Sequence, residues 1–433
     1  MTRYFVPSAA ASTSMKWLLP PKVLKLAKEK MYTIDKDIYL YGEGWTSGGY
    51  HGEYNNHYYV NDPDRDNNFV VGGAENNLVY SQLWESANSK GYVGGFNNGG
   101  RDYLKGQNDN GYNGSPYPQW GFVNIHKENV GSLSYNIAQM LKGINSYGEY
   151  SNPRQTINYA SCHDNYTLWD QLRYTLAPND YYKITKYTSD GSYEVSVSPI
   201  GNVEPDTLDL VRASITTHAA VFASNGAAFI QGGEELYRSK TYEDEEELAK
   251  LTAGGADAVV RPFSIVEGSE WAWKYKHYTT DPDEIQATSE VEMYGKITSH
   301  NSYKSPDSIN SFKWDRKISV NGVDVSNYNK VWSSLVSLHS QTTKYGYPEN
   351  KNTANFNVWD STTYNGSTGI ALWNGNDSGG YYFIFAGRGG ASIGFGGFAG
   401  SQIVFSSRDD YKFENYVLTL KPFTFICAKK GSF

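Results

Sequence analysis

Acidic residues follow three separate apolar stretches of the sequence, and their surroundings suit one kind of chemistry. Glu43 ends the stretch IYLYGE, Asp164 ends INYASCHD, and Glu234-Glu235 ends FIQGGEE. Cleavage of an acetal needs a carboxyl group that gives a proton to the leaving oxygen and a carboxylate that stabilises the cationic carbon. A helix cap or a turn accounts for a single acid, but three in succession favour a site.

Two of these acids have neighbours that suggest their roles. The apolar rings of Tyr41 and Trp45 would raise the pKa of Glu43, which makes Glu43 the candidate proton donor. Asp164 is the candidate electrostatic partner, and the adjacent His163 would hydrogen-bond a sugar hydroxyl. Taken alone, His163 would be read as a core histidine bonded to the backbone. The 37 Tyr and 11 Trp fit sugar stacking, and they fit a tyrosine-rich surface of no special purpose equally well.

The elements that position these acids alternate between strands and helices over most of the chain. Such alternation predicts an α/β fold with a parallel sheet covered on both faces, where ligands bind at the carboxyl ends of the strands. We expect strands at 37–43, 91–97, 156–164 and 226–235, and helices at 18–31, 130–144, 208–224 and 327–341.

Two segments interrupt this alternation, and the last part of the chain departs from it. Segment 182–206 contains a hairpin signal around Asp190-Gly191. Segment 242–299 carries the acidic run at 243–247, which is typical of a solvated face or a flexible insertion. From 348 onwards, alternating apolar residues and Gly-rich turns predict a separate antiparallel β domain.

Composition narrows the classes of partner. The chain has 433 residues, 39% of them hydrophobic, which suits a large α/β unit with a smaller domain. A net charge of −8 argues against nucleic acid and against an anionic membrane. Two Cys and eight scattered His give neither a disulfide framework nor metal-ligand spacing, so no cofactor is expected and calcium has no support. The N-terminus shows no clear signal peptide; localisation stays open, with the cytoplasm slightly favoured.

Five longer motifs resemble those of one enzyme family. YGEGW at 41–45, FNNGGRDYLKG at 96–106, QTINYASCHDNYTLWDQL at 155–172, FIQGGEELYRSK at 229–240 and HNSYKSPDSINSFKW at 300–314 follow the order found in type I pullulanases. Pullulanases are α-amylase-like glycoside hydrolases that cleave α-1,6 branch points. The resemblance implies a (β/α)₈ TIM barrel with its site at the carboxyl face and a trailing β-sandwich.

The resemblance also assigns roles to residues. Glu43 matches the general acid/base, and Asp164 matches the carboxylate that stabilises the transition state. His163 matches the neighbouring histidine that binds a hydroxyl. Trp45 and Trp169 are expected to form walls on which sugars stack.

One family motif is missing from the sequence. A retaining enzyme needs a second carboxylate as nucleophile, and the family carries it in a strand motif of the form GFRFD. Neither GFRFD nor the earlier motif DVVYNH occurs here, and no acid precedes Glu29. We therefore expect the C-terminal half of a barrel, strands five to eight, at 17–347, and a β-sandwich at 348–433, with 1–16 unassigned. Half a barrel would leave open edge strands, the first at 37–42.

Three functional hypotheses remain at this point. The chain is a pullulanase-type hydrolase that acts only with a separate N-terminal half of the barrel, or an inactive fragment of one; the fragment is favoured for the chain alone. It is otherwise a non-catalytic α-glucan-binding protein, because the aromatic residues and His163 would still grip a glucan. A relation to isoamylase is weakened by YGEGW and SCHDNYTLWD. In each hypothesis the partner is an α-glucan polysaccharide or oligosaccharide.

Overall fold

The structure is a computed structural model of the chain. It describes residues 3–5, 30–31, 33–35, 39–41, 93–106, 121–124, 131–143, 156–176, 183–187, 193–196, 206–240, 259–262, 274–277, 290–293, 296–299, 302, 307–320, 323–324, 328–346, 356–359, 369–376, 378–394 and 396–431. Glu43, Trp45 and the acidic run at 243–247 lie outside these residues.

A parallel sheet of five strands forms the base of the α/β region. Its order is β1 (Arg3–Phe5), β2 (Tyr39–Tyr41), β3 (Val93–Phe96), β4 (Thr156–Asn158) and β7 (Ala227–Ala228). Each strand pairs with the next one in parallel, for example Tyr41 with Gly94 and Phe96 with Ile157. The sequential order is what repeated strand–helix units produce, as the alternation predicted.

The N-terminal segment corrects one expectation. Residues 1–16 were unassigned, yet β1 lies among them and pairs with β2 from Arg3↔Tyr39 to Phe5↔Tyr41. The strand expected to be an open edge at 37–42 is therefore paired on both sides, with β1 and with β3. The backbone groups that an edge strand would leave unpaired are satisfied by these two neighbours.

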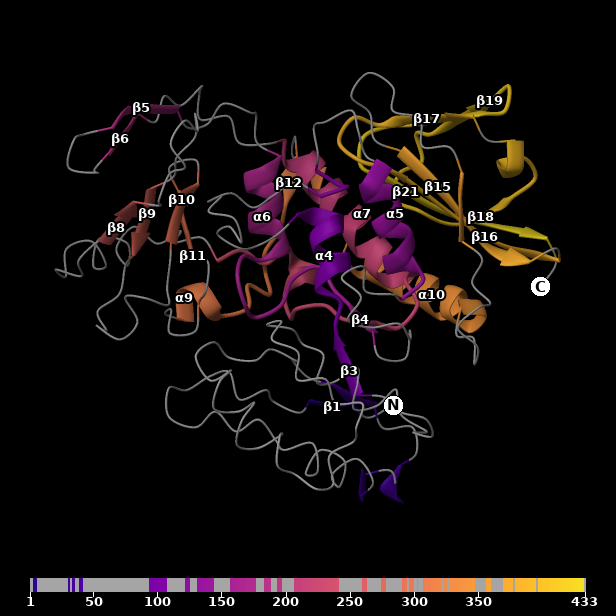
Figure 1. Ribbon diagram of the computed structural model, residues 1–433, viewed down its shortest axis with the longest axis horizontal. Helices are drawn as coiled ribbons and strands as arrows, with labels where there is room; N and C mark the ends of the chain where they lie inside the picture. Colours follow the sequence, from indigo (N-terminus) through magenta and orange to yellow (C-terminus); the bar gives the residue numbers. More distant parts are fainter. Residues whose placement is uncertain are drawn as a thin grey trace, which may run out of the picture.

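Helices connect the later strands of the sheet, and most of them lie together on one side of β1 and β3 (Figure 1). The described helices are α4 (Asn98–Lys105), α5 (Gly131–Leu141), α6 (Leu168–Thr175), α7 (Thr207–Ala223), α9 (Asp307–Asn310) and α10 (Tyr328–Gly346), with 3₁₀ turns η2 (Glu234–Leu236) and η3 (Gly396–Phe398). Side-chain caps begin three of them: Asn97 for α4, Thr167 for α6 and Asp206 for α7. In the described part of the chain, no helix is long and apolar enough to cross a membrane.

Three small antiparallel sheets lie outside the parallel sheet. Strands β5 (Lys183–Tyr187) and β6 (Tyr193–Ser196) pair antiparallel, as the hairpin signal predicted. Segment 242–299, expected as a solvated or flexible insertion, contains a four-stranded sheet of β8 (Val259–Pro262), β9 (Lys274–His277), β10 (Glu290–Met293) and β11 (Lys296–Ser299). A short pair, β12 (Ser319–Val320) and β13 (Val323–Asp324), precedes α10.

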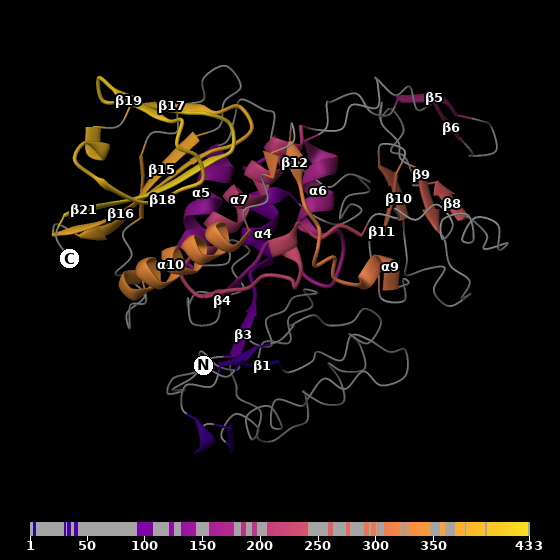
Figure 2. The same cartoon turned by 180° about the vertical axis from the view of Figure 1, so that it is seen from behind.

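Two antiparallel sheets close the chain, as the alternation after residue 348 predicted. The larger has the order β14 (Phe356–Trp359), β15 (Gly369–Asn376), β16 (Gly379–Ala386), β21 (Thr424–Gly431) and β18 (Gln402–Ser406). The smaller has the order β17 (Ala391–Gly394), β20 (Val417–Leu420) and β19 (Lys412–Glu414). In both views these sheets lie at the end of the molecule opposite β5, β6 and β8–β11 (Figures 1 and 2).

The larger closing sheet is buried on both faces, and its side chains alternate accordingly. Along β16, Tyr382, Ile384 and Ala386 join an apolar cluster with residues of the smaller sheet. Phe383 and Phe385, between them, join the main core with helices α5 and α7. Strands with period-two side chains divide their residues between two cores in this way. The closing sheets therefore share a core with the α/β region.

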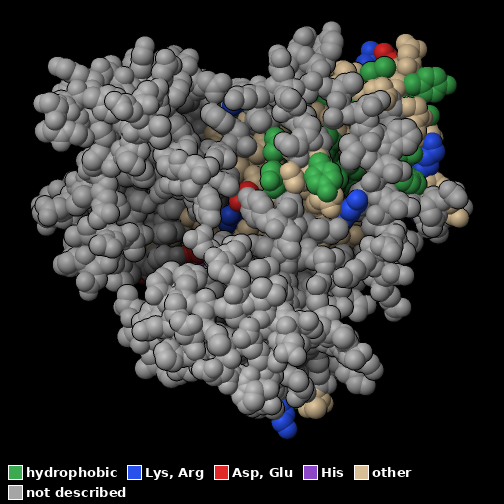
Figure 3. Space-filling view, viewed as in Figure 1, with side chains coloured by type: hydrophobic (Ala, Val, Ile, Leu, Met, Phe, Trp, Pro, Cys, Tyr) green, Lys and Arg blue, Asp and Glu red, His purple; other side chains and the backbone are tan. Residues whose placement is uncertain are grey.

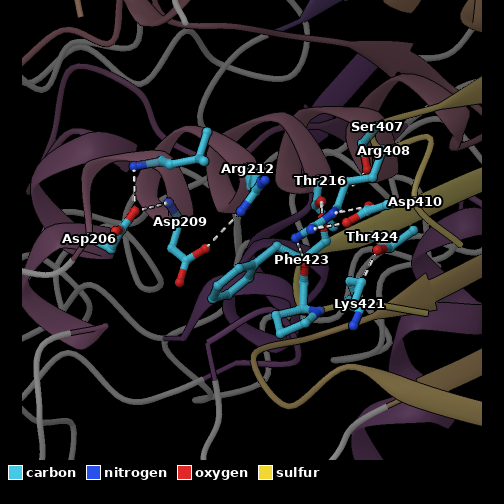
Figure 4. A network of polar contacts seen from close by, with 12 residues as sticks. Asp206, Asp209, Arg212, Thr216, Ser407, Arg408, Asp410, Lys421, Phe423 and Thr424 are labelled. Atoms are coloured by element: carbon cyan, nitrogen blue, oxygen red, sulfur yellow. Dashed lines mark hydrogen bonds and ion pairs between the residues drawn. The ribbon is translucent and has the colours of Figure 1, made fainter. Parts of the chain in front are cut away.

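Polar contacts reinforce this junction (Figure 4). Thr216 Oγ1 on α7 donates to the carbonyl oxygen of Phe423 at 2.9 Å. Arg408 donates to both carboxylate oxygens of Asp410, at 2.7 and 2.6 Å, and to the Pro422 carbonyl at 2.8 Å. The hydrogen bonds from Arg408 lower the pKa of Asp410 below its ordinary value. The Thr216 bond therefore joins α7 to a loop of the closing sheets, and Arg408 links Pro422 of that loop to Asp410.

Candidate functional site

The turn His163–Asn165 follows β4 and presents polar side chains to solvent. The side chains of His163 and Asp164 are 53% and 33% exposed, and His163 Nε2 lies 3.5 Å from Asp164 Oδ1. Asn165 has a φ of 63°, in the left-handed region that Asn tolerates better than most residues. We name these three residues the HDN turn. A partly exposed carboxylate beside an exposed imidazole is an arrangement that can bind a polyol.

A buried lysine, Lys240, hydrogen-bonds the backbone of the HDN turn. Lys240 is 1% exposed, and its Nζ donates to the carbonyl oxygen of Asn165. Burial lowers the pKa of Lys240 from 10.5 to about 8, partly offset by the nearby carboxylates of Asp170 and Asp164. The lysine therefore holds the backbone of the turn and adds positive charge near Asp164.

Asp170 links the same segment to helix α6. Its carboxylate accepts hydrogen bonds from Thr167 Oγ1 at 2.8 Å, from Ser239 Oγ at 2.5 Å and from the backbone N–H of Lys240 at 2.7 Å. Asp170 and Thr167 are both fully buried. Three donors satisfy a buried carboxylate that would otherwise be costly to bury. The segment Ser239–Lys240 is thereby fixed against the helix that follows the HDN turn.

Glu234 faces the interior. It is 3% exposed and accepts hydrogen bonds from Ser161 Oγ and from the backbone N–H of Gln231. His218 Nε2 on α7 lies 3.2 Å from Glu234 Oε2, and His218 Nδ1 lies 2.9 Å from the Ser214 carbonyl. Since a carbonyl only accepts, His218 Nδ1 is the donor of that bond. Glu234 therefore ties α7 to the end of β4.

Glu234 and Glu235 thus differ from the strand-end acids expected from the sequence. Strand β7 ends at Ala228, and the glutamates belong to the 3₁₀ turn η2. Strand β4 likewise ends at Asn158, earlier than expected. Residues that follow each strand turn away from the sheet to satisfy buried polar groups, and apolar patterning does not reveal that turn.

Buried amides join three strand ends. Asn97 Nδ2 donates to Asn158 Oδ1 at 2.9 Å, and Asn158 Nδ2 donates to the Asn225 carbonyl at 2.6 Å. Asn97 also caps α4, because its Oδ1 accepts from the Gly100 N–H at 2.9 Å. These bonds fix the ends of β3, β4 and β7 relative to one another, and so fix the origin of the HDN turn.

Two buried cations follow Asn97 on α4. Arg101 donates to Asp102 Oδ1 at 2.7 Å and to Tyr159 Oη at 2.9 Å. Burial by itself would lower the pKa of Arg101, but the negative charge of Asp102 helps to raise it above its ordinary value. Lys105 is fully buried, donates to Gln171 Oε1, and has a pKa lowered by burial from 10.5 to about 7. The motif FNNGGRDYLKG was recognised without roles for these residues. The signal available in the sequence was the spacing of Arg101 and Lys105, which lie four residues apart and so on one face of a helix.

The predicted site residues have different outcomes. His163 and Asp164 lie together at the carboxyl end of β4, as expected of a site at that edge. Trp169 is only 6% exposed, and its ring is covered by Tyr237, with ring centroids 5.1 Å apart, and by Arg316, 5.5 Å from the ring centre. This burial argues against Trp169 as a stacking wall. The positions of Glu43 and Trp45 stay predictions.

Metal ligands do not gather in the described residues: none of their His, Cys, Asp and Glu side chains forms a group of three or more able to hold a metal ion. Cys162 and Cys427 are both buried free thiols. Burial raises the pKa of Cys427, so this thiol resists ionisation.

Comparison with known proteins connects the chain to pullulanases. No protein-family model matches it. The chain is 33% identical over 95 residues to a pullulanase of Klebsiella pneumoniae, a stretch that covers 22% of this chain and 6% of that protein. A pullulanase of Klebsiella aerogenes is 32% identical over 95 residues, again 22% of this chain and 6% of that protein.

Solved pullulanases share the fold over nearly the whole chain. Pullulanase SAP of Group B Streptococcus, solved with maltotetraose, matches with a TM-score of 0.58 at 16% identity over 99% of this chain and 47% of its own. The Paenibacillus barengoltzii pullulanase, solved with maltohexaose and α-cyclodextrin, matches with a TM-score of 0.55 at 16% identity, over 99% and 48%. This chain therefore spans about half the length of these structures. The resemblance to pullulanases is confirmed. At 16% sequence identity, the match to the solved structures shows a shared fold and nothing more.

Proposed function

We propose that this chain carries the acid/base side of a pullulanase-type active site that cleaves α-1,6-glucosidic bonds of pullulan, glycogen or starch dextrins. In this proposal the parallel sheet is part of a (β/α)₈ barrel, and the two closing sheets form its trailing β-sandwich. The relation to pullulanases, and so to glycoside hydrolases, supports this reading.

The observation that carries the proposal is the position of the HDN turn. The turn follows β4, while the YGEGW motif begins at Tyr41, the last residue of β2. Since β2, β3 and β4 are parallel neighbours, their carboxyl ends share one edge of the sheet. Glu43 and Asp164 are then candidates to flank one glycosidic bond.

Each residue would have a definite part in the reaction. Glu43 would protonate the departing oxygen and later deprotonate water. Asp164 would stabilise the cationic sugar ring and its distorted shape, and His163 would hydrogen-bond a hydroxyl of that ring. Trp45 would offer an apolar face to the sugar. Trp169, being buried, would hold Tyr237 and Arg316 in place instead.

The nucleophile is the part of the machinery that the sequence does not supply. Because GFRFD does not occur in it, we propose that hydrolysis requires a nucleophile carried outside this sequence, and that the chain alone is inactive. Removing a nucleophile typically removes most of the rate even when other groups are intact. The same observation favours the second candidate, a non-catalytic α-glucan-binding protein.

Reducing-end release from pullulan by the purified chain, beside Glu43→Gln and Asp164→Asn, tests the proposal. We expect no release from any of the three. Release that both substitutions abolish would support the site and refute the inactivity. Release that survives Glu43→Gln would refute the assignment of the acid. Pull-down of the chain by insoluble starch distinguishes a glucan site from an unrelated function, because an inactive chain that also fails to bind starch contradicts both candidates.

A further inference from the structure

Two exposed aromatic rings, those of Phe312 and Trp314, lie on the segment that follows α9. Trp314 is 72% exposed and Phe312 is 40% exposed. Their ring centroids are 5.1 Å apart, and their planes are 20° from parallel. Large aromatic side chains are normally buried for the energy they gain. The two rings are stacked on each other, so Phe312 backs Trp314 and the outer face of Trp314 stays open as a flat apolar platform.

The platform is attached to the segment that supports the HDN turn. Arg238 lies under Phe312, with its guanidinium carbon 5.4 Å from the ring centre. The same arginine donates to the Gly232 carbonyl at 3.1 Å and to the Asn310 carbonyl at 2.9 Å. Arg238 is two residues from Lys240, whose Nζ holds the Asn165 carbonyl. One short segment therefore connects the platform and the HDN turn.

A second contact leads from the platform to the same turn. Arg316 follows Trp314 by two residues and lies 5.5 Å from the ring centre of Trp169. Trp169 lies in the first turn of α6, the helix that follows the HDN turn. The strip from Phe312 to Arg316 is thus held at both ends against residues that border the site.

The glycines of the GGEE motif make room for the platform. A Cβ at Gly232 would lie 2.8 Å from Cζ of Phe312, closer than carbon atoms approach one another. One at Gly233, where φ is 96°, would lie 3.2 Å from Cδ1 of the same ring. The acids of this motif suggested a site in the sequence, whereas its glycines leave the space that the Phe312 ring occupies.

We propose that Phe312 and Trp314 form a sugar-stacking platform that binds a glucose unit of the same α-glucan that the HDN turn contacts. The chemistry of the strip selects a glucan. Its rings offer flat apolar faces, and charged side chains of Asp315 and Lys317 beside them are exposed and can hydrogen-bond sugar hydroxyls. This inference rests on the proposed function, because it extends the same site along the glucan chain.

The test compares the affinity of maltotetraose for the full chain and for four variants, Trp314→Ala, Trp314→Phe, Gly232→Ala and Tyr135→Ala, by isothermal titration calorimetry. Trp314→Ala removes the exposed ring and few contacts. Gly232→Ala displaces Phe312 from below. The matched control is Tyr135→Ala on α5, where the ring is 61% exposed. In Figures 1 and 2, α5 and α9, the helix that precedes Phe312, lie on opposite sides of α4. Figure 3 shows hydrophobic side chains reaching the surface over α5, and the control likewise removes an exposed ring.

We expect Trp314→Ala to weaken maltotetraose binding about tenfold, the worth of one ring stack. Gly232→Ala should weaken it in the same direction, Trp314→Phe should restore most of it, and Tyr135→Ala should leave it unchanged. Unchanged affinity in Trp314→Ala, with the parent chain binding, would overturn the platform and leave the proposed function standing. Equal losses in Trp314→Ala and Tyr135→Ala would also overturn it. A parent chain that binds no maltotetraose would overturn both.

Discussion

The buried ammonium of Lys240 makes the stability of this chain depend on pH in a direction that can be worked out. Burial lowers the pKa of Lys240 in the folded chain to about 8, whereas a lysine in the unfolded chain keeps a value near 10.5. Between these values the unfolded chain binds more protons than the folded chain. The free energy of unfolding therefore rises with pH in this window, because deprotonation relieves the cost of burying the charge.

The size of this rise follows from the shift. Between the folded and unfolded pKa values, each pH unit adds about 1.4 kcal/mol to the free energy of unfolding for one titrating group. Raising the pH from 7 to about 9.5 therefore gives about 2 kcal/mol from Lys240. The upper limit avoids the range near pH 10 in which tyrosines ordinarily titrate. Lys240→Met keeps the length of the side chain and removes the titrating group, so this part of the rise should vanish.

Urea denaturation of the chain and of Lys240→Met at both pH values measures the effect. Because Lys105 and all other groups are present in both proteins, their contributions cancel in the difference between the two slopes. We expect the parent chain to gain about 2 kcal/mol more than Lys240→Met. Equal gains in the two proteins would show that the ammonium is not buried as described. Lys105→Met should show the same kind of loss, and it serves as an independent second case.

Two further substitutions test the support of the site and the shared core. Asp170→Asn removes a charged acceptor from three buried donors, and we expect it to lower the free energy of unfolding by about 2–4 kcal/mol; a urea curve that coincides with that of the parent chain would contradict the bonds to Ser239 and Lys240. Phe385→Ala empties a fully buried position between the closing sheet and the helices, and we expect a loss of about 3–5 kcal/mol. That loss should move far-UV and near-UV circular dichroism transitions together, whereas two separated transitions would show that the closing sheets unfold by themselves.

The long helices and the parallel pairing of the strands could be predicted from the sequence. The expected helix at 208–224 is α7 (Thr207–Ala223), and the expected helix at 130–144 contains α5 (Gly131–Leu141). Apolar residues at helical spacing predict these helices because the helical conformation places them on one face, where they can be buried together. Strand ends were predicted less well. Tyr159 and Cys162 continue the apolar pattern of β4 and are buried, but they are buried in a turn.

Helices rich in buried polar residues escaped prediction. Helix α4 buries Asn98, Arg101 and Lys105, and its cap Asn97 bonds to another strand. Hydrophobic periodicity cannot reveal a helix whose inner face is polar, because the pairing of those groups depends on residues far along the chain. Trp169 was expected to be a sugar-stacking wall and is buried, whereas Trp314 is exposed.

The central claim is that the HDN turn belongs to an α-glucan site, and affinity electrophoresis in gels that contain pullulan tests it most directly. The side chains of His163 and Asp164 are 53% and 33% exposed, and Asn keeps the shape of Asp, so both variants should keep the fold. Tyr135→Ala serves as the control. We expect pullulan to slow the parent chain and Tyr135→Ala equally, and to slow His163→Ala and Asp164→Asn clearly less. Equal migration of all four proteins with and without pullulan would contradict the account.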